Sequence, residues 1–257
     1  MHSTVIDLSS KNTRDLYGIK NENAFPIKKH LLIRSGRLAF LTDNDMNILH
    51  DEYGLKKIID LRNHAETVEE TDPRIEGVEY INLPLQKEEN HALAKDEESL
   101  RRMQEYFKEL RKRLEGDAKE VIKHMAGFYR DMAQSPYTAS QFGRFIKEVC
   151  DTDGAVLWHC SLGKDRAGLA TVIILELLDV ERQDIYDDYL YTNRCLYGDK
   201  GPKDPLDYMD RAVKEYLDAF YDEVEKRYGS FDAYLLKMDI DHDLRERFKI
   251  RYLKGYR

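Results

Sequence analysis

The sequence predicts an α/β fold in which a central, mostly parallel sheet is flanked by helices. An apolar run at residues 156–158 follows a turn signal and indicates a buried strand, and a longer apolar run at 169–178 indicates a buried helix. Upstream, helix-like and strand-like patterns alternate, which is typical of parallel strands joined by crossover helices. Because 257 residues is the length of one α/β domain with a sizeable core, we expect a single domain over residues 1–257.

The first elements are indicated by short local signals. A strand is expected at the apolar run of residues 31–33. Thr42 and Asp45 have the spacing of a capping box, so a helix of about ten residues is expected to begin there and to end at Gly54. The next strand is expected over residues 57–61.

Two charged residues, Asp60 and Arg62, lie at the end of that strand, and a further strand is expected over residues 77–84. Because ligands collect at the carboxyl ends of parallel strands, Asp60 and Arg62 are candidate substrate-binding residues. The alternative is that they pair with each other or cap a neighbouring loop.

Between residues 86 and 134 the sequence becomes highly charged and helical in its periodicity. Apolar side chains recur at helical spacing in two segments, first Met103, Tyr106, Phe107, Leu110 and Leu114, then Val121, Ile122, Met125 and Phe128. We therefore expect a helical insertion of about this extent. Two interpretations are open: a lid over the loop at residues 159–168, or an outer helical layer with a solvated charged face.

The remaining helices follow on either side of the central strand and loop. Ser135 and Pro136 predict the start of a helix that runs to Cys150, a residue that we expect in the core. Two or three more helices are expected from residue 206 to the end of the chain. One of them carries apolar residues at helical spacing that are expected to pack: Tyr216, Leu217, Phe220, Tyr221 and Val224.

The functional signal is the string HCSLGKDRAG at residues 159–168, between the central strand and its helix. Backbone N–H groups of such a loop converge at a helix N-terminus, where they and the helix dipole bind a phosphate oxyanion. The same field stabilises a thiolate, so Cys160 is a candidate nucleophile. Arg166 can offer two parallel N–H donors to the oxygens of a transferring phosphoryl group.

The neighbours of Cys160 supply the rest of the expected site. Ser161, Leu162 and Gly163 are candidate substrate-binding residues, and Gly163 permits a sharp turn. Lys164 is either a second cation facing the substrate or a solvent-facing residue at the helix start. His159 is expected to orient the loop or to influence the thiolate, and the alternative is a satisfied core histidine.

Several segments together resemble a known family. The string at 159–168 resembles the signature of cysteine-dependent phosphatases, and its GKDR version is similar to that of the atypical bacterial tyrosine/serine protein phosphatases, which include dual-specificity and lipid-active enzymes. The resemblance extends to the NTRDLYG, RSGRL, DLR with Glu66, and DYLYTN segments, at residues 12–18, 34–38, 60–66 and 188–193. It therefore covers most of the chain.

The resemblance implies a cysteine-phosphatase-like fold and a two-step reaction through a phosphocysteine intermediate, with no metal and no other cofactor. It implies Asp165 as the general acid, and Asp60 is the second candidate. The helix dipole stabilises an Asp165 carboxylate, which opposes acid work. Ala167 departs from the pattern, because many relatives carry a Ser or Thr hydroxyl there that helps to release the cysteine. This departure leaves a phosphate-binding pseudophosphatase open.

The expected partner is a phosphorylated protein or peptide, with phosphotyrosine first and phosphoserine or phosphothreonine next. If Lys164 faces the pocket, a phosphoinositide or inositol phosphate becomes the alternative substrate for the same chemistry. A thiol-redox or sulfur-transfer enzyme is a further alternative, but residues 164–166 would then lack a clear purpose.

Composition narrows the partners and the compartment. A net charge of −8 and a pI of about 5.6 argue against nucleic acid or an anionic membrane surface as the main partner. No apolar run reaches the length of a membrane span, so stable membrane insertion is not expected. The three cysteines lack disulfide or metal spacing, and the N-terminus lacks a signal-peptide pattern. We expect a cytoplasmic protein, with non-classical secretion and the oligomeric state left open.

Overall fold

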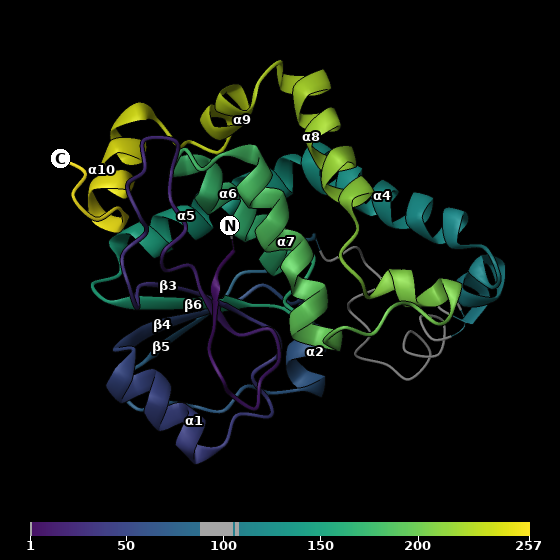
Figure 1. Cartoon of the computed structure of the whole chain (residues 1–257), viewed down its shortest axis with the longest axis horizontal. Helices are drawn as coiled ribbons and strands as arrows, with labels where there is room; N and C mark the ends of the chain where they lie inside the picture. The colour runs from purple at the N-terminus through teal and green to yellow at the C-terminus, as the bar shows by residue number, and fades with distance from the viewer. Residues whose placement is uncertain (1, 88–104, 106–107) are drawn as a thin grey trace.

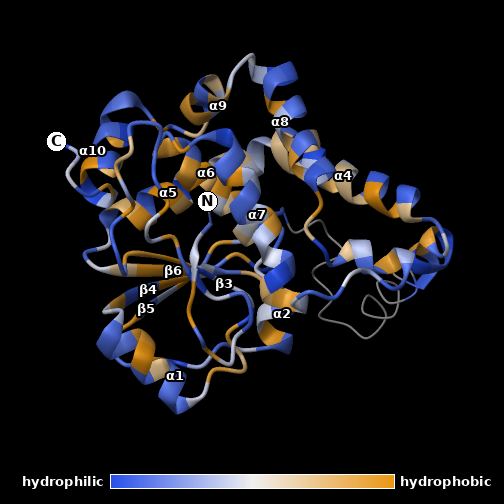
Figure 2. Cartoon of the chain, viewed as in Figure 1, coloured by the Kyte–Doolittle hydropathy of each residue, from blue (hydrophilic) through white to orange (hydrophobic). Residues whose placement is uncertain are grey.

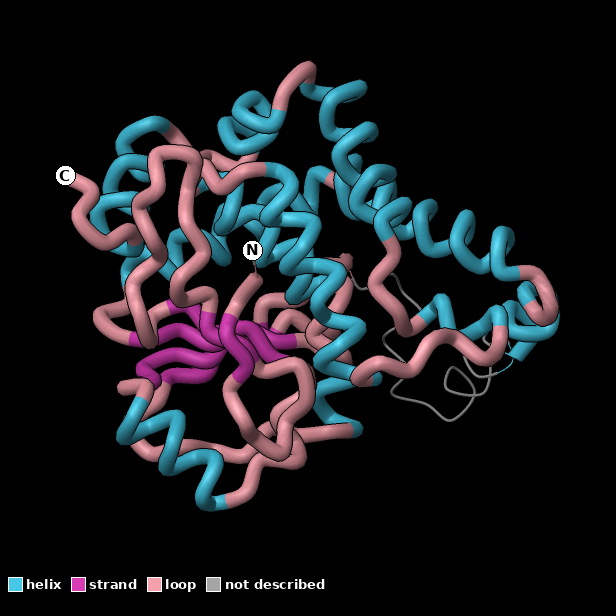
Figure 3. The backbone as a smooth tube through the Cα atoms, viewed as in Figure 1, coloured by secondary structure: helices cyan, strands magenta, loops and turns pink. Residues whose placement is uncertain are grey.

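The computed structural model describes residues 2–87, 105 and 108–257. Its centre is a sheet of strand order β1-β2-β3-β6-β4-β5 (Figures 1 and 3). The parallel strands are β3 (Leu32–Ser35), β6 (Ala155–His159), β4 (Leu55–Asp60) and β5 (Glu79–Asn82). The two-residue strands β1 (Thr4–Val5) and β2 (Arg14–Asp15) extend the sheet in antiparallel fashion. The predicted α/β fold with a mostly parallel sheet flanked by helices is confirmed.

Successive residues of each buried strand face opposite sides of this sheet. Val156 and Trp158 of β6 join the larger apolar cluster, whereas Leu157 between them joins the smaller one on the other side. The larger cluster includes residues of α5 (Pro136–Asp151), α6 (Arg166–Leu177) and α10 (His242–Tyr252). Figure 2 shows the apolar character of β6 and α6. The sheet is therefore covered on both faces.

The predicted elements recur with small shifts at their ends. Thr42 forms the expected capping box with Asp45, but the helix is divided into α1 (Asp43–Asn47) and a π-helical stretch, η1 (Ile48–Glu52). Ser135 caps α5 as expected through its bond with the Thr138 N–H group. The short helix α2 (His64–Glu69), which was not among the predicted elements, follows β4.

The C-terminal part contains three α-helices after residue 206, within the predicted two or three, and a 3₁₀ helix before them. After α7 (Arg182–Tyr197) come the 3₁₀ helix η2 (Pro205–Met209), α8 (Lys214–Tyr228), α9 (Phe231–Lys237) and α10. The apolar stripe predicted in this part lies on α8, and all five of its side chains are buried. Cys150 also lies in the core, as predicted.

The predicted insertion lies partly outside the described residues, which exclude Met103, Tyr106 and Phe107. Residues 108–114 are helical, and Leu110 and Leu114 pack with Val121 against η2. The second predicted helix is α4 (Ala118–Gln134), which packs along α8 (Figure 1). Among the helices of the described ranges, none is both long enough and apolar enough to cross a membrane.

Candidate active site

The loop between β6 and α6 makes a tight turn at Gly163, where φ is +68°. A β-carbon added there would lie 2.5 Å from the Ser35 carbonyl oxygen and 2.8 Å from the Gly36 nitrogen. Glycine is therefore required twice, once for the left-handed backbone and once for the close approach of β3.

Three successive carbonyl oxygens of this loop, at residues 161–163, point outward to donors from the N-terminal segments. They accept, in order, from the Arg37 N–H at 3.1 Å, the Asn12 Nδ2 at 3.0 Å and the Arg34 Nη2 at 2.6 Å. Because a trans peptide group is planar, the N–H groups of residues 162–164 point the opposite way. No acceptor for these N–H groups occurs in the described part of the chain. The arrangement is that of an anion-binding cradle.

Cys160 begins the loop and is buried, with 3% of its surface exposed. Two positive charges act on Cys160. The guanidinium groups of Arg34 and Arg166 would both interact favourably with a thiolate at this position. The N-terminus of α6 begins at Arg166, six residues after the cysteine. Helix dipole and guanidinium charges thus act together on the sulfur, as a nucleophilic thiolate requires.

Arg166 is held by a carboxylate that sequence reasoning did not place in the site. Its Nη1 and Nη2 donate to the two carboxylate oxygens of Glu66 at 2.5 and 2.7 Å, and Ser161 Oγ donates to the same residue at 2.7 Å. Burial alone would lower the pKa of Arg166, but the bonds and charge of Glu66 raise it. The arginine is thus fixed in place and remains cationic.

Glu66 owes its position to α2. It forms a capping box with Asn63, which is a signal that the sequence carried and that could have indicated a helix start. Burial would raise the pKa of Glu66, but the hydrogen bonds and charge of Arg166, aided by Ser161, lower it to about 2.

We expect this depressed pKa to contribute to acid stability. The contribution is present above the unfolded pKa of about 4.3 and is lost as the pH falls through about 2. Glu66→Gln should therefore remove part of the fall in the free energy of unfolding between about pH 4 and pH 2, measured by urea unfolding. Glu225→Gln, at an exposed position of α8, is the matched control. Equal pH slopes for wild type and Glu66→Gln would contradict the assignment.

Lys164 and Asp165 turn toward the segment between η2 and α8. The Lys164 ammonium donates to the carbonyl oxygens of Met209 at 2.6 Å and Arg211 at 3.2 Å, and it lies 3.1 Å from Asp165 Oδ1. Lys164 is fully buried, so its charge holds the 209–211 backbone rather than facing an open pocket. Asp165 also accepts a hydrogen bond from the Tyr129 hydroxyl of α4 at 2.7 Å.

Asp60 and Arg62 pair with each other, which is the alternative that their positions left open. Arg62 donates to both carboxylate oxygens of Asp60, at 2.9 Å from Nε and 2.8 Å from Nη2. Arg62 Nη2 also donates to Asp72 at 2.9 Å. His159 is fully buried, and its Nε2 lies 2.8 Å from the other oxygen of Asp72. These residues form a network around His159, which precedes Cys160 in the sequence, and they support the end of β6.

Within the described residues, Asp60, Asp72 and His159 are also the group that could hold a metal ion, since their ligand atoms lie within 4.8 Å of one another. The Arg62 guanidinium already bridges the two carboxylates. One of the two negative charges of this cluster is therefore compensated by the protein itself.

A second buried network supports the loop from below. Asp188 of α7 receives Arg14 Nη1 at 3.0 Å on one oxygen and Arg34 Nη1 at 2.9 Å on the other. The N–H and hydroxyl of Ser3 bond to the same carboxylate. Burial would raise the pKa of Asp188, but the two arginines lower it to about 2. Because Arg34 also donates a hydrogen bond to the Gly163 carbonyl oxygen, this network fixes the position of the loop relative to α7.

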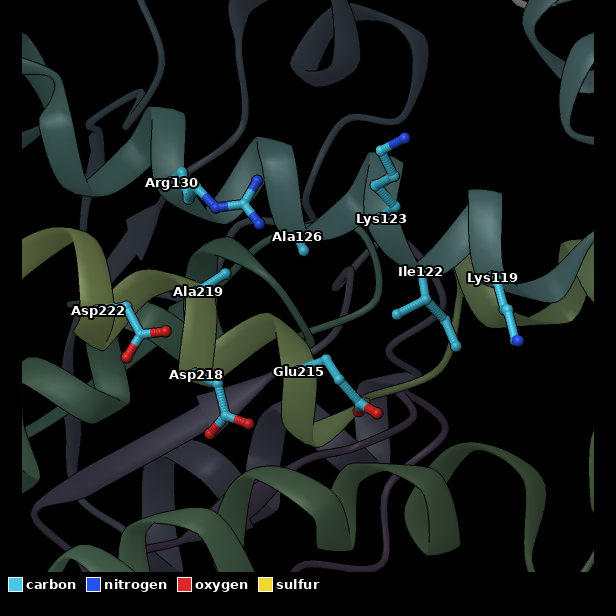
Figure 4. Close-up of a pocket in the computed structure, with 9 residues that line it drawn as sticks. All are labelled: Lys119, Ile122, Lys123, Ala126, Arg130, Glu215, Asp218, Ala219 and Asp222. Carbon is cyan, nitrogen blue, oxygen red and sulfur yellow. The ribbon is translucent and has the colours of Figure 1, made fainter.

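Two cavities of the described residues are not lined by the 159–168 loop. One of about 400 Å³ lies between α4 and α8 (Figure 4). Its charged lining residues are Lys119, Lys123 and Arg130 on α4 and Glu215, Asp218 and Asp222 on α8. A smaller one of about 210 Å³ lies beside η2.

The sequence is similar to those of known proteins over most of its length. A model of the tyrosine phosphatase family matches residues 8–254. A tyrosine-protein phosphatase of Nostoc commune is 27% identical over 197 residues, a match that covers 74% of this chain and 57% of that protein. A putative tyrosine-protein phosphatase of Cupriavidus necator is 24% identical over 257 residues, covering 93% of this chain and 86% of that protein. The chain thus spans little more than half the length of the Nostoc relative.

Among solved structures, the core catalytic domain of the PP-IP phosphatase SIW14 from S. cerevisiae, in complex with citrate, is similar to this chain with a TM-score of 0.36. The sequences are 15% identical, and the match covers 84% of this chain and 96% of that one.

Proposed function

The chain belongs to the tyrosine phosphatase family, and from this premise we propose that it hydrolyses phosphate monoesters with Cys160 as the nucleophile. The observation that carries the proposal is the cradle itself. Its carbonyl oxygens point outward and accept hydrogen bonds, so its N–H groups point inward. Arg166 is held beside it by two hydrogen bonds to Glu66. Such a site binds a tetrahedral oxyanion directly in front of the cysteine.

The proposed first step is attack of the Cys160 thiolate on phosphorus, in line with the leaving oxygen. The S–P bond forms, the ester P–O bond breaks, and Asp165 gives its proton to the leaving oxygen. The loop N–H groups and Arg166 hold the three equatorial oxygens while charge shifts across them. In the second step water attacks phosphorus, Asp165 takes its proton, and the S–P bond breaks to release inorganic phosphate.

For the substrate, we propose phosphotyrosine in proteins or peptides, with phosphoserine and phosphothreonine as further substrates. Lys164 does not face an open pocket, which weighs against it as an extra cation for phosphoinositides or inositol phosphates. Ala167 is buried in the first turn of α6, where it offers no hydroxyl to help break the phosphocysteine. Slow second-step turnover is therefore part of the proposal, with a binding-only protein as its extreme.

We further propose that residues 1–257 act as one phosphatase domain with its helical insertion at about 86–134, and that it works in the cytoplasm. The three cysteines support a reducing compartment, since all of them are free.

The test is hydrolysis of a panel of phosphotyrosine and phosphoserine peptides, phosphoinositides and inositol phosphates by the wild-type chain. Turnover of the phosphotyrosine peptide that disappears in Cys160→Ser would support the proposal. Preference for the lipid or inositol members would move the assignment to that substrate class. Binding of phosphate without turnover of any member would identify a pseudophosphatase, and Ala167→Ser would then be the first reversion to test.

Asp165→Asn should slow the hydrolysis of poor leaving groups far more than that of activated ones. An unactivated phenolate needs a proton as it leaves, whereas para-nitrophenolate does not, so we expect a loss of about 100-fold or more for phenyl phosphate and a much smaller loss for para-nitrophenyl phosphate. The measurement is kcat/KM for the two esters at one pH, because kcat/KM reports the first step even when the second step is slow. Asp60→Asn is the matched comparison because Asp60 is the second candidate acid. Equal losses on both esters in Asp165→Asn would remove Asp165 from this role.

A further inference from the structure

The Tyr129 side chain connects the helical insertion to the active loop. It projects from α4, is fully buried, and places its hydroxyl 2.7 Å from Asp165 Oδ1. Its oxygen also lies 2.7 Å from the hydroxyl of Tyr189 on α7. Three elements far apart in sequence thus meet at one carboxylate.

These bonds have one consistent direction. A phenol has a single proton, and Tyr129 donates its proton to Asp165, so Tyr189 must donate to Tyr129. The Tyr189 oxygen in turn interacts with the backbone N–H group of Val213, the residue that precedes α8. A series of hydrogen bonds therefore runs from the Val213 N–H group through Tyr189 and Tyr129 to the Asp165 carboxylate.

Both groups that contact the carboxylate reach the same oxygen. Tyr129 donates a hydrogen bond to Asp165 Oδ1 at 2.7 Å, and the Lys164 ammonium forms an ion pair with it at 3.1 Å. In the described part of the chain no hydrogen bond to Oδ2 occurs. An oxygen that accepts a hydrogen bond and faces an ammonium group is the less basic of a carboxyl pair, so the proton of the acid form belongs on Oδ2.

We propose that Tyr129 is a positioning residue that holds the transferable proton of Asp165 on Oδ2 and keeps this carboxyl ready to release it. The inference deepens the proposed phosphatase function and depends on it for its catalytic meaning. It also gives α4 a role in the chemistry, because displacement of this helix would remove the donor. An outer helical layer can in this way control the acid without covering the site.

The sign of the effect follows from the charges around Asp165. The groups that face it are Lys164 and Arg166 from the loop and α6, Tyr129 from α4, Tyr189 and Tyr197 from α7, and Tyr216 from α8. Tyr129 stabilises the carboxylate more than the neutral acid, because hydrogen bonds to charged groups are stronger. Loss of its hydroxyl should therefore let the acid stay protonated to higher pH.

The first experiment is the pH profile of kcat/KM for phenyl phosphate in Tyr129→Phe, because kcat/KM reports the first step, in which Asp165 gives its proton. We expect the basic limb to move up by about one pH unit, the equivalent of one charge-assisted hydrogen bond. Tyr189→Phe should move it in the same direction by less, because Tyr129 remains in place. The control is Tyr234→Phe on α9, since the buried Tyr234 hydroxyl has no hydrogen-bond partner among the described residues. Superimposable profiles for wild type and Tyr129→Phe would overturn the inference.

A second measurement is independent of turnover. The ¹³C signal of the Asp165 carboxyl is titrated by NMR in Cys160→Ser and in Cys160→Ser/Tyr129→Phe. An upward displacement of the titration midpoint in the double variant supports the contact even if no substrate is hydrolysed. An unchanged midpoint rejects it even if the phosphatase is active. Failure of the phosphatase proposal itself is seen separately, as absence of Cys160-dependent turnover in the wild type.

Discussion

Cys160→Ser should lower kcat for every hydrolysed substrate by roughly 10⁴-fold or more, while inorganic phosphate still binds. A serine hydroxyl in the same place is a far weaker nucleophile than a thiolate. The cradle does not depend on the sulfur, because residues 161–163 are fixed by Arg37, Asn12 and Arg34.

The measurement pairs steady-state hydrolysis with the shift in melting temperature caused by inorganic phosphate. Cys195→Ser is the matched control, because this half-buried cysteine lies on α7 outside the loop and should retain activity. Retained turnover in Cys160→Ser would exclude the phosphocysteine route. Loss of phosphate binding together with activity would show that the variant had damaged the cradle.

Asp188→Asn should have the largest effect on stability, because it leaves two buried arginines without a counter-charge. Arg14, Arg34 and Asp188 are all at most 1% exposed. Removing one partner of a buried ionic network costs about 3–5 kcal/mol, which for a chain of this size lowers the melting temperature by roughly 10 °C. Activity should fall as well, because Arg34 holds the Gly163 carbonyl.

Differential scanning calorimetry with Asp222→Asn as the control measures this effect. Asp222 lies exposed on α8, so the same loss of charge there should cost no more than about 0.5 kcal/mol. Similar melting temperatures for the two variants would mean that the buried ionic network contributes little to stability.

The sequence predicted the parts of the fold that are determined locally. The cap at Ser135, the capping box at Thr42 and the apolar stripe of α8 each act within a few residues, and each was found where it was expected. The strand, loop and helix around Cys160 likewise follow from their own composition. Strand ends were less certain because pairing decides them: β4 begins at Leu55, where it meets Ala155 of β6.

The parts that could not be predicted depend on distant partners. β1 and β2 are two residues long and have no hydrophobic pattern, so only the pairing of β2 with β3 and of β1 with β2 defines them. Glu66 lies 100 residues before Arg166, and its part in the site appears only when α2 meets the loop. Lys164 could be assigned to the pocket or to solvent from sequence, but it faces the 209–211 backbone.

Tyr129 shows how a functional side chain can be hidden in a packing pattern. It directly follows Phe128 in the amphipathic stripe of α4, where an aromatic residue is most simply a core residue. Its ring is indeed packed, against Tyr189 and Tyr216. Only the position of its hydroxyl, at Asp165, distinguishes it from its neighbours.

The buried network at Asp188 also has a consequence for how the chain folds. Arg14 and Asp188 are 174 residues apart, and Asn12 is 150 residues from the loop carbonyl that it holds. Contacts of such separation form late, because the entropy of closing the intervening chain must be overcome first. At a synthesis rate of about 5–20 residues per second, Arg14 waits roughly 10 to 35 s on the ribosome before its partner is made. Arg34, which bonds both Asp188 and the Gly163 carbonyl oxygen, therefore reaches its final position beneath the loop only after Asp188 has been made.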